Sequence, residues 1–180
     1  MTIATPPVPR VLALDPMSRG FGFAVLEGPT NLVDWGIRNA PNDNTRALLR
    51  KISELTDLYH PDVIVIEDCR HVRSRRRQRV RSVVTQVAKL ATPDTEVQLI
   101  PAVLVQNVFG AGRAISKYRM ATLVTEHFQE IAYRLPPERK PWMPEDPRFA
   151  IFDAVAFGLT YFLLDDSDTP ADREPLKNAA

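Results

Sequence analysis

The first forty residues show short apolar runs separated by turn signals. The run from Val11 to Leu14 ends in Asp15-Pro16 and predicts a buried strand. Two more strands are expected over residues 21–26 and 32–38, because glycine and proline mark turns on either side of them. Three consecutive strands with short connections predict an antiparallel meander.

The rest of the chain alternates between helical and strand patterns. Residues 63–67 form a continuous apolar run that ends in an acid, which suits a parallel strand buried on both faces of a sheet. Another short strand is expected over residues 96–100. Helical spacing or capping signals predict further segments over residues 45–59, 80–90, 101–108, 116–131 and 147–164. The pattern therefore predicts an α/β fold with a five-stranded mixed sheet flanked by helices.

Length and composition add the domain organisation. The chain of 180 residues is 44% hydrophobic, which is typical of one globular domain. We expect that domain to cover residues 10–164, after a flexible Pro-rich lead over residues 1–9. Residues 165–180 are acidic and polar and are expected to form a disordered tail.

The chain carries neither a membrane-spanning pattern nor a secretion signal. No apolar run is long enough to cross a bilayer, and the first nine residues lack the basic and apolar regions of a signal peptide. Cys69 is the sole cysteine, which excludes an internal disulfide. These features predict a cytoplasmic protein.

Three acids occupy positions where a carboxylate is costly. Asp15 and Glu67 each end a buried apolar strand, and Asp153 interrupts an otherwise apolar helix. Buried carboxylates need a partner, and a divalent cation with oxygen ligands, such as Mg²⁺, would provide one. Taken singly, an acid after a strand is favoured to be a solvated loop residue, and Asp153 alone fits a partly exposed helix face as well as a site. The combination of all three favours a site.

Four segments resemble, in order, the motifs of RuvC-type Holliday junction resolvases. The first joins a strand, Asp15-Pro16 and a second strand that contains Gly22. Three further motifs follow: a strand that ends in an acid, a segment with a proline, two glycines and a lysine before a helix, and a terminal helix with an Asp-Ala pair. These correspond to residues 61–67, to Pro101 with Gly110, Gly112 and Lys117, and to residues 153–156.

The resemblance implies an RNase H-like fold and a metal-dependent endodeoxyribonuclease of the crossover junction type. Asp15, Glu67 and Asp153 would hold Mg²⁺ or Mn²⁺, with two ions at the scissile phosphate. Lys117 resembles the active-site lysine of the family, although an exposed helix lysine is an equally good interpretation. The family acts as a homodimer on branched DNA in recombination and repair, so a homodimer is expected here.

The chain departs from the family pattern in its last helix and in its first motif. The family places a second acid or histidine one turn before the terminal aspartate, where this chain has Ala150. Asp146 is a candidate replacement, but it precedes Asp153 by seven residues, which corresponds to roughly 10 Å along a helix axis. A helix N-cap is therefore the favoured interpretation of Asp146. Met17 also stands where the family usually has glycine.

Basic residues predict where DNA would bind. The net charge is only +1, but seven arginines lie between residues 70 and 81. Because arginine binds phosphate with two hydrogen bonds, this segment is expected to contact the DNA backbone. A second basic group follows the glycines near residue 110. The candidate DNA-binding residues are Arg70, Arg73, Arg75, Arg76, Arg77, Arg79, Arg81, Arg113, Lys117 and Arg119.

The sequence therefore favours a structure-selective DNA endonuclease that resolves Holliday junctions or related branched DNA. Two alternatives stay open. One is a related nuclease that acts on forks, flaps or RNA, and the other is a catalytically inactive DNA-binding or scaffolding module with the same fold. The bulky aromatic residues Trp35 and Trp142 are expected in the core.

Overall fold

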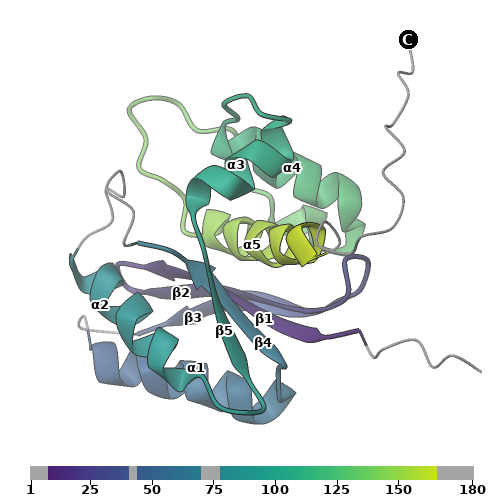
Figure 1. The fold of residues 1–180 in the computed structure, drawn as a ribbon. Coiled ribbons are helices and arrows are strands. Elements are labelled where there is room, and N and C mark those ends of the chain that lie inside the picture. Colours follow the sequence, from purple (N-terminus) through teal and green to yellow (C-terminus); the bar gives the residue numbers. More distant parts are fainter. Residues whose placement is uncertain (1–7, 41–43, 70–77, 166–180) are drawn as a thin grey trace, which may run out of the picture.

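The computed structural model of the protein describes residues 8–40, 44–69 and 78–165. Its centre is a five-stranded sheet in the order β3-β2-β1-β4-β5 (Figure 1). The first three strands are antiparallel, whereas β4 and β5 run parallel to β1, so the predicted mixed sheet is confirmed. The strands are β1 (Arg10–Met17), β2 (Gly20–Glu27), β3 (Leu32–Asn39), β4 (Val63–Glu67) and β5 (Glu96–Ile100).

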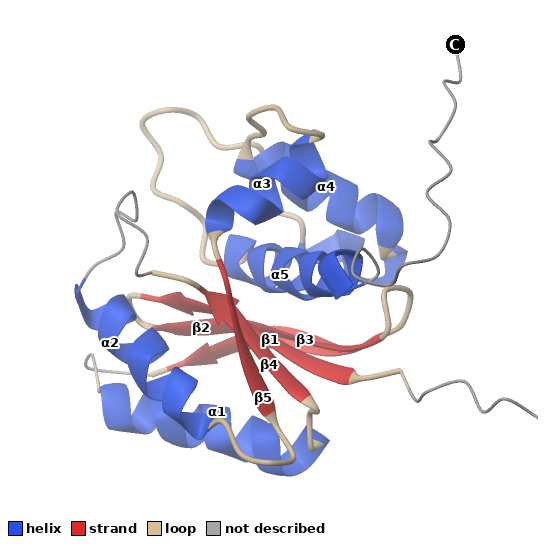
Figure 2. Ribbon diagram, in the orientation of Figure 1, coloured by secondary structure: helices blue, strands red, loops and turns tan. Residues whose placement is uncertain are grey.

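Helices cover both faces of the sheet (Figure 2). The helices α1 and α2 pack on one face, and α3, α4 and α5 lie over the other. Two short 3-10 helices, Ala88–Leu90 and Gln129–Arg134, follow α2 and α4. The α-helices are α1 (Thr45–Tyr59), α2 (Gln78–Val87), α3 (Ala102–Gly110), α4 (Lys117–His127) and α5 (Phe149–Asp165).

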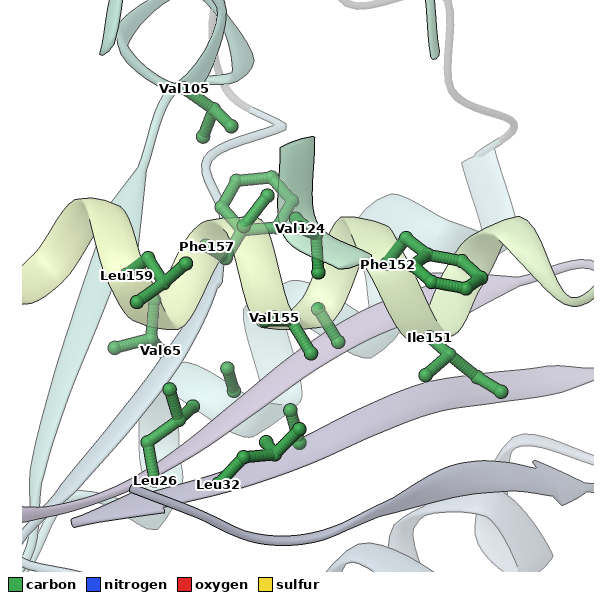
Figure 3. Packing of buried hydrophobic residues seen from close by; sticks show 14 of the residues in the cluster. Leu26, Leu32, Val65, Val105, Val124, Ile151, Phe152, Val155, Phe157 and Leu159 are labelled. Atoms are coloured by element: carbon green, nitrogen blue, oxygen red, sulfur yellow. The ribbon is translucent and has the colours of Figure 1, made fainter. Parts of the chain in front are cut away.

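The helix α5 lies directly on the sheet because its sequence is apolar on nearly every side. Ile151, Phe152 and Val155 are fully buried in the hydrophobic cluster around α5, and Figure 3 shows Ile151 and Val155 pointing from the helix toward the strands. Gly158 permits close packing, since a methyl group there would lie 2.5 Å from the Leu26 side chain. A helix buried on most of its surface has few places for a charged side chain, so an acid on it requires a specific role.

Two predicted boundaries were wrong. Strand β1 continues through Pro16 to Met17, so Asp15 lies inside the strand and not at its end. The helix expected to reach residue 131 ends at His127, and a 3-10 helix follows. Phe128 and Ile131 continue the helical spacing of apolar residues beyond the end of α4. Both side chains are buried, so their packing in the core explains why the pattern extends past the helix.

The expectation that Trp142 belongs to the core was also wrong. Its side chain is 78% exposed and stacks beneath the Lys140 ammonium, at 5.5 Å from the ring centre. Trp35, by contrast, is partly buried against the α5 side of the core. The expected lead and tail lie outside the described residues, except for Val8, Pro9 and Asp165.

Candidate active site

Strands β1 and β4 present an acid to the same face of the sheet. They run parallel, with Ala13 beside Val65, and both of these residues face α5. Side chains alternate between the two faces of a strand, so Asp15 and Glu67, each two residues farther along, also face α5. The parallel pairing of β1 and β4 therefore explains how two acids 52 residues apart in sequence reach one region.

The third acid comes from the helix that crosses this face. Asp153 lies in the second turn of α5, whose contacts include β1 and β4. The exposed fractions are 2% for Asp15, 6% for Glu67 and 5% for Asp153. Among the described residues, these are the buried acids. Three carboxylates withdrawn from water on one side of a sheet are stable only with compensating cations or hydrogen-bond donors.

Lys117 supplies one such cation. It is the first residue of α4, where the Ser116 side chain caps the helix by accepting a hydrogen bond from the Arg119 amide. The Lys117 ammonium donates to Oδ2 of Asp153 at 2.8 Å and to Oε1 of Glu145 at 2.6 Å. The cap thus places the Lys117 side chain against an acid of α5.

The carboxylates around Lys117 strengthen its positive charge. Partial burial alone would lower its pKa, but Asp153, Glu145 and the more remote Asp15 outweigh burial and raise the pKa above the ordinary lysine value. Lys117 is therefore an ammonium at neutral pH and cannot serve as a general base there. Its side chain is 45% exposed, so the charge is also accessible from solution.

A small cavity opens beside these groups. Its volume is about 80 Å³, and Glu67, Asp153 and Lys117 contribute the charged part of its lining. Val105 and Phe157 belong to its apolar wall. Electrostatic interactions are stronger in such a cavity than in water, because its charged groups lie beside an apolar wall.

The oxygen donors of this region fit a hard divalent cation. In the described part of the chain, however, no three His, Cys, Asp or Glu side chains lie close enough together to form a complete metal cage. Mg²⁺ needs no such cage, because it keeps several waters and is usually bound by one or two carboxylates together with substrate phosphates. The buried, strand-borne acids are compatible with that mode of binding.

Asp146 lies in the turn that leads into α5, three residues before the first residue of the helix. Its Oδ1 accepts a 2.9 Å hydrogen bond from the Arg148 amide, and the Arg148 guanidinium donates to both of its carboxylate oxygens. The side-chain hydrogen bonds from Arg148 hold the pKa of Asp146 below its ordinary value. The partners of Asp146 thus agree with the capping interpretation that the sequence favoured.

Most of the predicted arginine segment lies outside the described residues, namely Arg70, Arg73, Arg75, Arg76 and Arg77. Arg79 belongs to α2, where only its backbone is described. Arg81, two residues farther along the same helix, is exposed.

Two other candidate arginines flank Lys117 in sequence. Arg113 is exposed in the connection between α3 and α4. Arg119 is exposed on α4, where its guanidinium pairs with Glu126 at 3.2 Å. Both are accessible for DNA contact, but Arg119 would have to exchange a partner for a phosphate.

Glu145 is the site residue that sequence reasoning missed. It lies in the Pro-rich connection before α5, which has no periodicity, and it is 28 residues from Lys117. Glu138 and Glu145 look alike in the sequence, since each follows a proline in this connection. Only the folded position of Lys117 distinguishes them.

Comparisons with known proteins find similarity to Holliday junction resolvases. No family model matches the chain. The crossover junction endodeoxyribonuclease RuvC of Akkermansia muciniphila is 24% identical over 168 residues, which cover 87% of this chain and 92% of that protein. Among the described residues, no helix is both long enough and apolar enough to cross a membrane.

Solved structures of resolvases share the fold. Thermus thermophilus RuvC superimposes with a TM-score of 0.59 at 18% identity, covering 88% of this chain and 96% of that one. The same protein in complex with a Holliday junction substrate gives 0.60 at 15% identity, with the same coverage. The yeast mitochondrial Holliday junction resolvase gives 0.57 at 13% identity, covering 87% of this chain and 78% of that one. The chain is therefore similar in sequence to RuvC along most of both chains, and it shares the RNase H-like fold of these resolvases.

Proposed function

We propose that the chain is a structure-selective DNA endonuclease that resolves Holliday junctions or related branched DNA by metal-dependent phosphodiester hydrolysis. The observation that carries the proposal is the convergence of Asp15, Glu67 and Asp153, all nearly inaccessible, on the α5 face of the sheet beside Lys117. The RuvC protein of A. muciniphila supports the same activity, since it aligns with most of the chain.

In this mechanism the three acids are the metal-binding groups. Asp15, Glu67 and Asp153 would hold two Mg²⁺ or Mn²⁺ ions. When bound, such ions supply an activated water and stabilise the leaving oxygen of the phosphodiester. The strands and α5 fix the carboxylates in place, so little reorganisation is needed at the moment of reaction.

Lys117 would act on the phosphate. An ammonium group has three N–H donors, so Lys117 can keep its contacts to Asp153 and Glu145 and still donate to a phosphate oxygen. Because its charge is permanent at neutral pH, it stabilises negative charge that develops at phosphorus and takes no part in proton transfer. Its partial exposure permits this approach from solution.

The proposal extends to the assembly and its location. A four-way junction presents two equivalent strands for cutting, and a homodimer would provide one site for each. The exposed arginines Arg81, Arg113 and Arg119, with those of residues 70–79, would bind the DNA backbone. A cytoplasmic location suits the single buried cysteine, Cys69.

The test is incubation of the purified protein with labelled four-way junction, fork, flap and linear duplex, with and without Mg²⁺ or Mn²⁺. We expect paired nicks in the junction that require the metal. Glu67→Gln should abolish cutting and keep junction binding. Glu96→Gln is the matched control, because Glu96 is an exposed acid at the far end of the neighbouring strand β5.

The same experiment discriminates between the alternatives. Preferential cutting of forks, flaps or an RNA strand would show that the substrate is not the junction, while the proposed metal site would still stand. Metal-independent binding to junctions without any cleavage would indicate an inactive DNA-binding module. Cutting by Glu67→Gln at the parent rate would show that the acids have another role.

A further inference from the structure

We propose that Glu145 is a fourth acid of the active site and binds metal together with Asp153, an inference that rests on the nuclease function proposed above. Glu145 precedes α5 in the chain, and its side chain is 49% exposed. Its carboxylate nevertheless points to the Lys117 ammonium, which also holds Asp153. The connection before α5 thus brings a second acid to the ammonium group that Asp153 contacts.

The geometry of the shared lysine places the two carboxylates close together. Oε1 of Glu145 lies 2.6 Å from the Lys117 nitrogen, and Oδ2 of Asp153 lies 2.8 Å from the same atom. The distance between the Glu145 and Asp153 oxygens is therefore no greater than the sum of these two hydrogen-bond lengths. Two oxygens that share one Mg²⁺ each lie about 2.1 Å from it. A small movement of an exposed glutamate is enough to change from one arrangement to the other.

The first turn of α5 cannot supply this acid itself. Ala150 lies one turn before Asp153, and its backbone is packed against β2: a methyl group on Gly22 would lie 2.1 Å from the Ala150 carbonyl oxygen. Ala150 is also only 4% exposed. An additional carboxylate near Asp153 must therefore come from outside this turn.

The two neighbouring acids of the connection before α5 have different partners. Asp146 is held by the amide and guanidinium of Arg148, within the turn that leads into α5. Glu145, its direct neighbour, is bonded instead to Lys117 and reaches the site. Of these two residues, Glu145 is therefore the one positioned to bind metal.

The charges of the site provide a way to separate metal binding from simple support of Lys117. Each carboxylate near Lys117 adds negative charge, which favours divalent cations and disfavours phosphate. If Glu145 binds metal, its neutralisation weakens metal binding and does not weaken metal-free DNA binding. If Glu145 only steadies Lys117, metal affinity in the absence of DNA stays the same.

The experiment compares Glu145→Gln with Glu138→Gln, whose parent residue is an exposed acid of the same connection. Mn²⁺ binding is measured without DNA by calorimetry and by the metal-dependent shift of the melting temperature, and junction cleavage is measured across a Mn²⁺ series. We expect Glu145→Gln to need roughly tenfold more Mn²⁺ in both assays, a loss of the size seen when groups that support a metal site are removed. Glu138→Gln should behave like the parent.

Parent-like Mn²⁺ affinity in Glu145→Gln, together with unchanged melting in the absence of metal, would overturn the assignment of Glu145 while junction cleavage by the parent still stood. Failure of the nuclease proposal has a different signature: the parent would bind Mn²⁺ and cut no DNA, and the affinity comparison would still decide the role of Glu145. A parent that binds no Mn²⁺ would overturn both.

Discussion

Gly22 of β2 lies directly beneath the Ala150 carbonyl of α5, so closely that a methyl group on Gly22 would be 2.1 Å from the oxygen. Gly22 is also the strand partner of Asp15. The same close approach therefore fixes the height of α5 above the sheet next to one acid of the site, one helical turn before Asp153. Packing and site geometry are coupled at this point.

We predict that Gly22→Ala destabilises the fold and impairs cleavage. The added methyl group has to displace backbone atoms, and overpacking of this kind costs about 1–3 kcal/mol. The matched control is Gly110→Ala, whose methyl group would lie 3.5 Å from its nearest neighbour, an ordinary contact. Urea unfolding should show the loss for Gly22→Ala only. Equal stability of the two variants would show that α5 is not held at this height.

Much of the fold follows from the sequence because apolar runs and caps are local signals. Strands β4 and β5 begin and end where the apolar pattern predicts, and α1 covers the predicted residues 45–59. Its cap is Asn44, whose side chain accepts a hydrogen bond from the Ala47 amide. The extension of β1 through Pro16 was not predictable in this way. Pairing with β4 ends at Leu14, and beyond it the missing N–H of a proline removes no bond of that ladder.

The site was predictable only in part. Asp15 and Glu67 are recognisable because an acid at the end of an apolar run is unusual, and Asp153 because it interrupts an apolar helix. Glu145 has neither signal, and its proximity to Lys117 depends on how the connection before α5 folds back. Contacts between distant residues in irregular segments leave no periodic trace in a sequence.

Tyr59 is predicted to make stability sensitive to alkaline pH. Its hydroxyl donates a 2.5 Å hydrogen bond to Asp34, which joins the end of α1 to β3. Burial and then this bond raise the pKa of Tyr59 from 10.0 to about 12. A raised pKa means that the stabilisation is complete below pH 10.0 and is lost as the pH rises towards 12.

The corresponding variant is Tyr59→Phe. It should lose about 1 kcal/mol at neutral pH, the usual contribution of one hydrogen bond. The difference from the parent should shrink between pH 10.0 and about 12. Chemical denaturation at several pH values measures this, and a difference that stays constant over this range would contradict the assigned bond.

Arg113 and Arg119 are predicted to contribute unequally to DNA affinity. Arg113 is exposed, whereas the Arg119 guanidinium is already paired with Glu126. Arg113→Gln should reduce the salt dependence of junction binding by about one phosphate contact. Arg119→Gln should have a smaller effect. Arg119 must break its ion pair with Glu126 before it can bind a phosphate, and this cost offsets part of its contribution to DNA affinity. Binding titrations at several salt concentrations test this, and equal slopes for both variants would contradict the distinction.

The last prediction separates Asp153 from Asp146, which lie seven residues apart around the start of α5. Asp153→Asn should lose metal-dependent cleavage, because Asp153 is buried against Lys117 and would bind the metal. Its stability without metal should change by less than about 1 kcal/mol, since asparagine still accepts a hydrogen bond and Lys117 is partly solvated. Asp146→Asn should keep most of its activity, because asparagine caps helices about as well as aspartate.

Acid unfolding provides the second readout for this pair. Arg148 holds the pKa of Asp146 below its ordinary value of 3.8, so the stabilisation is present above pH 3.8 and is lost as the pH falls through the lowered pKa. Asp146→Asn should remove this part of the acid sensitivity. Cleavage at the parent rate by Asp153→Asn would exclude it from the metal site. An inactive Asp146→Asn that still folds and binds junctions would make Asp146 a catalytic acid and not only a cap.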